Sequence, residues 1–338
     1  MHARLAVRAL AAVALSALTA SVAQAQASAQ QAPQVSVTGV VYSQFLYQLK
    51  DTANHVNNFN VTRAYVNVVG RFGGGISTRV TTDVFQAGGS LVARLKYAYF
   101  AYSKTGSPLS YKFGLLHTPW LDWEETLWDY RMQGSMAEDR NGYATAADLG
   151  AGVDGHWDGE RINGQLTFVN GEGYAGGTGD QRKDLQARVS VRVKPTNDAS
   201  RVGGVRVTGY VGIGKATGGA DRNRYIGMVS YRTSQYTVAG EYASNKDGAV
   251  TGSVISAFGV YHFQTSKFSG IARVDLLDPD NNVTGDHQTR IIAGVSYQVS
   301  ANLRLLLDVD NLSYQGGSPS PAAEAVRSQA LFQTQFTF

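Results

Sequence analysis

Basic side chains recur at alternate positions within stretches of this sequence that are otherwise rich in apolar residues. In residues 182–194, Arg188 and Arg192 share one parity, while Val189 and Val191 share the other. Successive side chains of a β-strand point to opposite faces, so such a pattern collects the charges on one face. A wall lined by cations raises the local concentration of anions and favours their passage. The chemistry that this pattern predicts is therefore the attraction and transport of small anions.

The same parity argument assigns a larger set of basic residues to the polar faces of predicted strands: Arg63, Arg71, Arg79, Arg94, Lys96, Lys112, Arg188, Arg192, Arg206 and Arg232. Fewer acids share those faces, namely Asp83, Asp154, Asp184, Glu241, Asp275, Asp308 and Asp310. The excess of cations predicts a pore lining that prefers anions. The alternative is that Arg and Asp on neighbouring strands pair only to stabilise a wet wall.

The stretch from Thr118 to Asp148 carries the other chemically distinctive residues, which comprise Pro119, Trp120, Asp122, Trp123, Glu124, Glu125, Trp128, Asp129 and Arg131. Loops of this length within a compact fold are usually functional or disordered, and the Trp content argues against disorder. Pro119 suits the first turn of a helix. We expect the stretch to fold into the interior and narrow a pore. An outward loop that makes subunit contacts is the alternative, because aromatic residues are common at interfaces.

The elements that must position these residues are predicted as sixteen strands of about ten residues each, separated by Gly, Asn, Asp, Pro and Ser. They are expected at 35–49, 59–72, 76–85, 91–103, 109–117, 149–157, 162–170, 183–194, 203–214, 222–232, 236–243, 254–263, 267–276, 288–299, 303–311 and 326–338. Short connections alternate with longer ones, as expected of short periplasmic turns and long outer loops. The predicted fold class is all-β, a transmembrane antiparallel β-barrel with an inward-folded third loop.

Both ends of the chain suggest export to the outer membrane. Arg4 and Arg8 precede an apolar run that ends in Ala23-Gln24-Ala25, which predicts a signal peptide at 1–25. A short segment, 26–34, then leads into the barrel at 35–338. The 338 residues include no Cys, so no disulfide framework is available. At the other end, Phe332, Phe336 and Phe338 share one parity, as expected of a strand with one face in lipid.

Residues 114–120, Gly-Leu-Leu-His-Thr-Pro-Trp, resemble the segment that opens the inward-folded third loop in the phosphate-selective porin family and related general porins. Arg63-Ala64-Tyr65 and the terminal Phe338 add to the resemblance. It implies a trimeric sixteen-stranded outer-membrane channel for small anions, phosphate among them, and a Phe338 that is read by the assembly machinery. The acid-rich loop is instead similar to porins for general solutes, in which such acids face basic residues, here Arg63, Arg79 and Arg94, across a transverse field.

The predicted function is passive diffusion of small hydrophilic solutes through a homotrimer held in outer-membrane lipid, with no enzymatic activity, cofactor, metal or nucleic-acid partner. A barrel enzyme is one alternative, but Ser313, His55 and His287 are scattered along the sequence. A soluble, secreted all-β binding protein is another, because a β-sandwich shows the same alternation with its faces exchanged. Residues 278–282, Asp-Pro-Asp-Asn-Asn, offer oxygens suited to calcium but fit a turn equally well.

Overall fold

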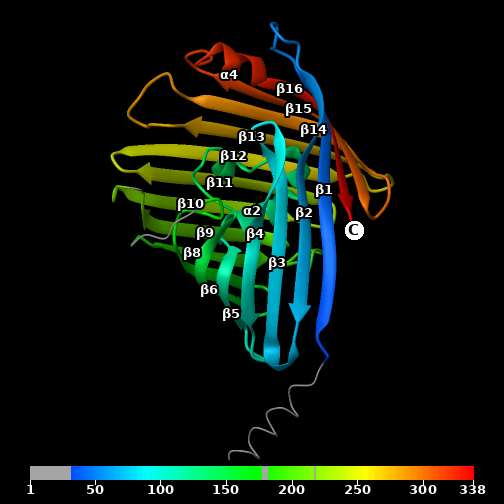
Figure 1. Ribbon diagram of the computed structural model, residues 1–338, viewed down its shortest axis with the longest axis vertical. Coiled ribbons are helices and arrows are strands. Elements are labelled where there is room, and N and C mark those ends of the chain that lie inside the picture. The colour runs from blue at the N-terminus through cyan, green and yellow to red at the C-terminus, as the bar shows by residue number, and fades with distance from the viewer. Residues whose placement is uncertain (1–31, 177–181, 217) are drawn as a thin grey trace, which may run out of the picture.

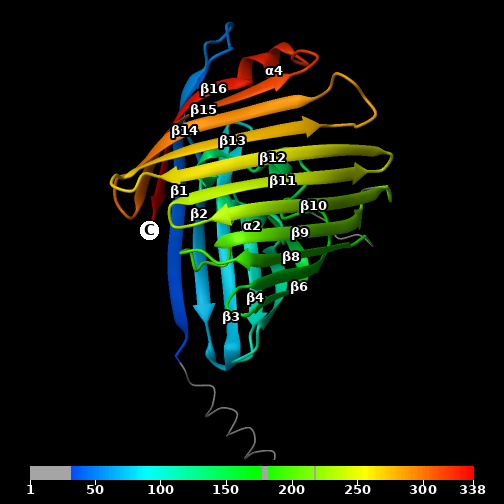
Figure 2. The ribbon, with the colours of Figure 1, turned by 180° about the vertical axis from the view of Figure 1, so that it is seen from behind.

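The computed structural model describes residues 32–176, 182–216 and 218–338, and over these ranges the strands form a closed antiparallel barrel (Figures 1 and 2). Each strand pairs with its neighbours in chain order, and β1 pairs with β16. The predicted sixteen-stranded barrel is thereby confirmed. The predicted signal peptide, 1–25, and residues 26–31 of the predicted short segment 26–34 lie outside the described residues.

The first eight strands are β1 (Gln34–Gln48), β2 (Asn57–Arg71), β3 (Ile76–Ala87), β4 (Ser90–Tyr102), β5 (Leu109–His117), β6 (Ala147–Trp157), β7 (Ile162–Val169) and β8 (Asp184–Lys194). The second eight are β9 (Gly204–Lys215), β10 (Asp221–Arg232), β11 (Tyr236–Asp247), β12 (Val250–His262), β13 (Phe268–Asp278), β14 (Gln288–Gln298), β15 (Leu303–Tyr314) and β16 (Ser328–Thr337). The largest departure from prediction lies at 244–253, where a longer connection was expected. There β11 and β12 continue to a tight hairpin in which Asp247 pairs with Val250.

The barrel closes where the last residue meets the first strand. The Phe338 amide donates to the Gly39 carbonyl at 3.0 Å, and the Gly39 amide donates to the Phe338 carbonyl at 2.8 Å. The Phe338 ring covers Gly39 so closely that a Cβ there would lie 2.2 Å from a ring carbon. The terminal residue is therefore part of the sealed wall, while its role in assembly stays a prediction.

The outer surface of the barrel is apolar along the strands, as the parity argument predicts. On β8, the outward-facing Val189 and Val191 are 53% and 36% exposed, whereas the inward-facing Arg188 is 2% exposed. Tyrosines cluster near strand ends on the same outer face, where the rings of Tyr236 and Tyr261 lie 5.2 Å apart. Such a band with aromatic rings at its edges is the surface that a membrane-spanning barrel presents to lipid. It contradicts the soluble β-sandwich, whose apolar faces would be turned inward.

A β-bulge in β4 changes which side chains face the interior. Thr81 of β3 pairs with Tyr97 and Thr82 pairs with Leu95, so Lys96 is the extra residue. A bulge of this kind re-aims the side chains that follow it. As a result Lys96 and Tyr97 are both buried within the barrel, at 5% and 8% exposure, although strict alternation would send one of them outward.

In the described part of the chain, helical structure is confined to short segments: η1 (Gly73–Gly75), α2 (Leu121–Trp128), η2 (Arg131–Gln133), α3 (Ala137–Arg140) and α4 (Pro321–Val326). None of these helices, within the part of the chain that the structure describes, combines the length and apolar character of a membrane span.

The connection between β5 and β6, residues 118–146, is called the constriction loop below, and it lies inside the barrel. In both views α2 lies between a front wall, β1–β5, and a back wall, β8–β15, whose strands cross at a steep angle (Figures 1 and 2). Trp120, Trp123 and Trp128 of this loop are at most 1% exposed and belong to the buried hydrophobic cluster. The predicted inward-folded third loop is confirmed.

Candidate channel constriction

The constriction loop is held against the back wall by arginines that donate to its backbone carbonyls. These bonds are Arg188 to Pro119 O, Arg232 to Thr126 O and Leu127 O, Arg304 to Asp129 O, Arg273 to Ser135 O and Arg224 to Tyr143 O, at 2.9 to 3.3 Å. An irregular segment inside a barrel has carbonyls that no sheet partner can satisfy. Guanidinium groups supply several donors each, so a few inward-facing arginines can fix the whole loop.

Aromatic packing completes the attachment of the loop to the back wall. The guanidinium carbons of Arg188 and Arg206 lie 4.1 and 5.4 Å from the centroid of the Trp123 ring. On the same side, the Trp128 ring packs against Phe258 at 5.4 Å. Cations stacked on an aromatic face in a desolvated site contribute about 2 kcal/mol each. The back wall and the loop thus form one packed unit.

The opposite surface of the loop faces the front wall across a cavity of about 280 Å³. Asp122, Glu125 and Arg131 of the loop line one side, and Arg79 and Lys96 of the front wall line the other. Tyr42, Tyr65, Tyr97, Asn67 and Thr81 fill the wall around the two cations. The cavity thus brings the predicted loop acids Asp122 and Glu125 opposite the predicted wall cations Arg79 and Lys96.

The acids of this cavity have arginine partners. Asp122 pairs with Arg201, a residue of the turn before β9, at 2.7 Å, and Glu125 pairs with Arg131 at 2.8 Å. Burial opposes the charge on Asp122, but His117 and Arg201 outweigh it and hold the pKa of this carboxyl below its usual range. Asp122 is therefore ionised, with its charge largely compensated.

The cations of the front wall have no such compensation. Arg79 donates to Asn67 Oδ1 at 2.8 Å and stacks over Tyr97 at 4.6 Å. Lys96 donates to the Tyr65 hydroxyl at 3.3 Å. Neither has a carboxylate within ion-pair distance among the described residues. Neutral partners hold these side chains in place without cancelling their charge.

Arg63 and Arg94 also face the interior from the front wall, but they share an acid. Arg63 Nη1 and Arg94 Nε lie 2.8 and 3.0 Å from the same oxygen of Asp83, a side chain with no exposure. The Phe85 ring lies beneath both guanidinium groups, at 5.5 and 3.9 Å. Two cations on one carboxylate leave a net positive charge, next to Lys96 along the same wall.

Several predicted site residues lie elsewhere than expected. Arg188 and Arg206 are 2% and 0% exposed, so they are buried against the loop instead of lining open pore. Glu124 is also fully buried and faces Glu241 on the back wall. Asp129 points to Arg304 at 3.3 Å, away from the front wall. The parity of the strands gives the inward direction correctly, but it does not say that the loop covers these positions.

The remaining predicted residues bind structural partners or lie at a rim. Arg192 donates to the carbonyls of Gly203, Gly159 and Ser200 in the short turns. Arg232 pairs with Asp198 at 2.8 Å. Lys112 pairs with Asp154. Arg71 is exposed at the end of β2.

Sequence reasoning missed the tyrosines of the cavity and two loop residues that reach across the interior. The sequence predicts no role for Tyr42 or Tyr97 and uses Tyr65 only in the resemblance of Arg63-Ala64-Tyr65, and the bulge at Lys96 hides the inward direction of Tyr97. Arg201 and Tyr174 lie in connections, where alternation gives no direction. Their partners, Asp122 and Arg94, lie 79 and 80 residues away in the sequence.

The acidic run at 278–282 forms a turn in the structure. Asp280 Oδ1 accepts the Asn282 amide at 3.1 Å. Ligand atoms of Asp278, Asp286 and His287 lie within 4.8 Å of one another, and His287 pairs with Asp278 at 3.0 Å. This pairing accounts for the cluster without a metal ion, and we assign no function to it.

No protein-family profile matches the sequence. A search of curated proteins also finds no match. Solved structures do match. OmpF of Salmonella typhi, in a complex with daunomycin, aligns with a TM-score of 0.67 at 12% identity over 90% of this chain and 97% of its own. An anion-selective porin from Comamonas acidovorans aligns with a TM-score of 0.61 at 13% identity over 90% of this chain and 100% of its own. The trimer form of OmpT, an outer membrane protein of Vibrio cholerae, gives a TM-score of 0.62 at 11% identity over 91% and 100%.

At these identities the comparisons establish the fold. The chain has the fold of the bacterial outer-membrane porins: a closed barrel of sixteen described strands with an inward-folded third loop. A barrel of this fold with an apolar outer band is a multi-pass protein of the bacterial outer membrane, as the sequence predicts.

Proposed function

We propose that this protein is an outer-membrane channel for passive diffusion of small hydrophilic solutes, with a preference for anions. The observation that carries the proposal is the imbalance in the constriction. Arg79 and Lys96 face the cavity without an acidic partner, while Asp122 and Glu125 are each paired with an arginine. Uncompensated cations that line such a cavity attract anions and repel cations. This function requires no catalytic residue, and we assign none.

The proposal is tested by recording from the purified full-length protein in a planar bilayer with a KCl gradient. We expect ion-conducting pores whose reversal potential indicates a higher permeability to chloride than to potassium. The double variant R79Q/K96Q should shift the reversal potential towards cation selectivity, because the uncompensated charges are gone. The shift should be largest in dilute salt, since the Debye length is about 30 Å at 0.01 M and about 3 Å at 1 M.

The matched control is R71Q, which removes one positive charge at the exposed end of β2, away from the constriction. It should leave the reversal potential close to that of the parent. Absence of any conductance would contradict the channel proposal itself. Equal shifts in R71Q and R79Q/K96Q would instead contradict the assignment of selectivity to the constriction.

We further propose that the protein assembles as a homotrimer in the outer membrane. Support comes from the fold, which it shares with an OmpT structure described as a trimer form, and from the general preference of homo-oligomers for closed symmetry. Crosslinking of the detergent-solubilised protein should give a product of three chains. A species that stays at the mass of one chain under the same conditions would contradict this assembly.

A further inference from the structure

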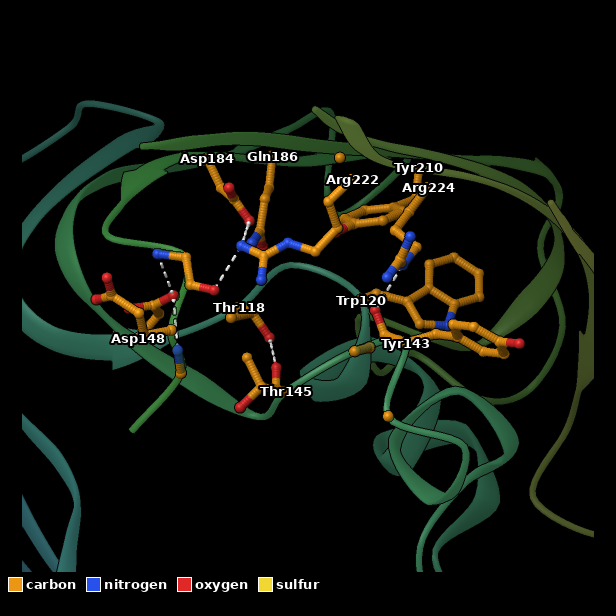
Figure 3. A pocket seen from close by; sticks show the side chains of 16 residues that line it. Thr118, Trp120, Tyr143, Thr145, Asp148, Asp184, Gln186, Tyr210, Arg222 and Arg224 are labelled. Carbon is orange, nitrogen blue, oxygen red and sulfur yellow. Dashed lines mark hydrogen bonds and ion pairs between the residues drawn. The ribbon is translucent and has the colours of Figure 1, made fainter. Parts of the chain in front are cut away.

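A second loop reaches into the barrel beside the constriction loop. The connection between β7 and β8 begins with residues 170–176, which we call the L4 strap. Its base is fixed by Asp148, whose carboxylate accepts the amides of Gly171 at 2.8 Å and Gly173 at 3.2 Å (Figure 3). Both glycines have positive φ, 93° and 72°, which other residues adopt only at a cost. The strap therefore has a defined conformation at its base.

The back wall and the constriction loop hold the strap from two further sides. The Arg222 guanidinium bridges the Gly171 carbonyl and Asp184 (Figure 3). Thr145 of the constriction loop packs against Gly173, where an added Cβ would lie 2.8 Å from its hydroxyl oxygen. A cavity of about 160 Å³ remains between these groups. The strap is thus placed by charged and backbone contacts that do not involve its tip.

At the tip, Tyr174 extends from the strap to the front wall. Its hydroxyl accepts a hydrogen bond of 2.8 Å from Arg94 Nη2 on β4, and its ring centroid lies 4.2 Å from the Arg94 guanidinium carbon. Strand β4 is separated from β7 along the wall by β5 and β6, so the contact spans the interior instead of joining neighbouring strands. Tyr174 also packs against the buried cluster of the constriction loop.

The group that Tyr174 covers can bind an anion. Arg63 and Arg94 share the single carboxylate of Asp83, and both are partly exposed, with side-chain exposures of 19% and 24%. Arg63 uses only Nη1 in a side-chain hydrogen bond among the described residues, which leaves its other N–H groups available. Two guanidinium groups with one positive charge in excess suit a small oxyanion such as phosphate or a carboxylate.

We propose that Tyr174 forms a second selectivity element, in which its ring and hydroxyl cover an oxyanion subsite made by Arg63 and Arg94 on the long-loop side of Lys96. The inference rests on the proposed channel function and adds a residue that controls access to the basic wall. An anion that enters from the long-loop side meets Arg63 and Arg94 first, and it must compete with the tyrosine hydroxyl for Arg94. Lys96 and Arg79 then follow along the same wall.

The test uses the full-length protein in planar bilayers, with inorganic phosphate as the probe of the subsite. Y174A should raise the single-channel conductance, shift the reversal potential towards anions, and increase the reduction of chloride current by added phosphate. Y174F keeps the ring over Arg94 but removes the acceptor oxygen, so it should increase phosphate block with little change in conductance. Within the R94Q background, Y174A should no longer change selectivity or phosphate block.

The possible failures are distinguishable. A parent protein without conductance contradicts the channel function, whereas a conducting parent whose conductance and selectivity are unchanged in Y174A contradicts the role of Tyr174. Equal selectivity shifts from Y174A in the parent and in R94Q show that Tyr174 does not act through Arg94. If Y174A does not assemble into a barrel, Y174F decides the question, and unchanged phosphate block in that variant overturns the proposal.

Discussion

Arg79 on β3 and Arg273 on β13 occupy the same kind of position, an inward-facing site on a strand of alternating pattern. Arg79 on the front wall contacts neutral partners and borders the cavity. Arg273 on the back wall is 1% exposed, pairs with Asp275 at 2.7 Å, and donates to the Ser135 carbonyl of the constriction loop. The Arg79 guanidinium therefore borders an open cavity, whereas the Arg273 guanidinium is already bound by Asp275 and the constriction loop.

The difference between the two walls arises from one asymmetric element. The constriction loop packs on the back wall, and its carbonyls and acids take up the guanidinium groups there. Strands β2 to β4 of the front wall have no such partner, so Arg79 and Lys96 stay uncompensated and Arg63 and Arg94 share Asp83. We therefore expect the selectivity of the proposed channel to depend less on how many arginines face inward than on which wall the loop covers.

The largest expected effect comes from removing a back-wall arginine. R273Q leaves Asp275 without its cation beside the buried Glu124 and Glu241, and we expect a loss of about 3–5 kcal/mol in the free energy of unfolding. R79Q on the front wall should change the same quantity by no more than about 0.5 kcal/mol, because its site is open to water. Urea titration of both variants in detergent micelles measures the two values. Similar losses in both would remove the distinction between the walls.

A second prediction concerns pH, because buried carboxyl groups lie where the loop meets the back wall. Burial raises the pKa of Glu138 in α3 to about 7, although Asn245 and Arg224 act to lower it. Burial likewise raises the pKa of Glu124 in α2. No oxygen of either carboxyl group, nor of Glu241, has a hydrogen-bond partner among the described residues. Burial therefore favours the protonated, neutral form of these carboxyl groups in the folded protein.

Because the pKa of Glu138 is raised in the folded protein, stability should decrease as the pH rises. The unfolded chain releases the Glu138 proton near pH 4.5, whereas the folded protein keeps it until about pH 7. The contribution of Glu138 to stability is therefore greatest below pH 4.5 and falls as the pH rises to about 7, by up to about 1.4 kcal/mol per pH unit. Unfolding midpoints between pH 4.5 and 8 measure this slope. E138Q should have a shallower slope, and an unchanged slope would mean that Glu138 is ionised in the folded protein.

Removing the negative charge of Glu125 tests the contrast between the two walls from the side of the constriction loop. E125Q removes the nearer acidic partner of Arg131, which also lines the constriction, and leaves it only Asp139 at 3.7 Å, so the positive charge opposite Arg79 and Lys96 increases. The reversal potential should shift further towards anions. The energy involved is of the order of 1 kcal/mol, the interaction of two unit charges about 4 Å apart in bulk water. E172Q in the L4 strap, away from this cavity, is the control. A shift towards cations would contradict the pairing of Glu125 with Arg131.

The barrel could be predicted from the sequence because alternation, turn residues and strand length are local signals. Boundaries agree closely at β5, for example, where Leu109–His117 was expected and is found. The site could be predicted only in part. Asp122 and Glu125 do face Arg79 and Lys96, but alternation cannot show that Glu124 turns to the back wall or that Trp123 covers Arg188. Those outcomes depend on how a loop packs against strands that are distant in the sequence, 65 residues away for Trp123 and Arg188 and 117 for Glu124 and Glu241. A bulge such as that at Lys96 also changes the parity without a clear sequence signal.

The smallest expected effect comes from converting the paired arginines of the front wall into unpaired ones. D83N removes the negative charge shared by Arg63 and Arg94 but keeps an amide oxygen that can still accept hydrogen bonds from them. Both cations would then resemble Arg79, and the reversal potential should shift towards anions by less than in E125Q, because Tyr174 still covers Arg94. Recordings in dilute and in 1 M KCl should show the shift only in dilute salt, since screening at 1 M acts within about 3 Å. A shift that persists in 1 M KCl would mean that the substitution has changed the shape of the pore rather than its charge.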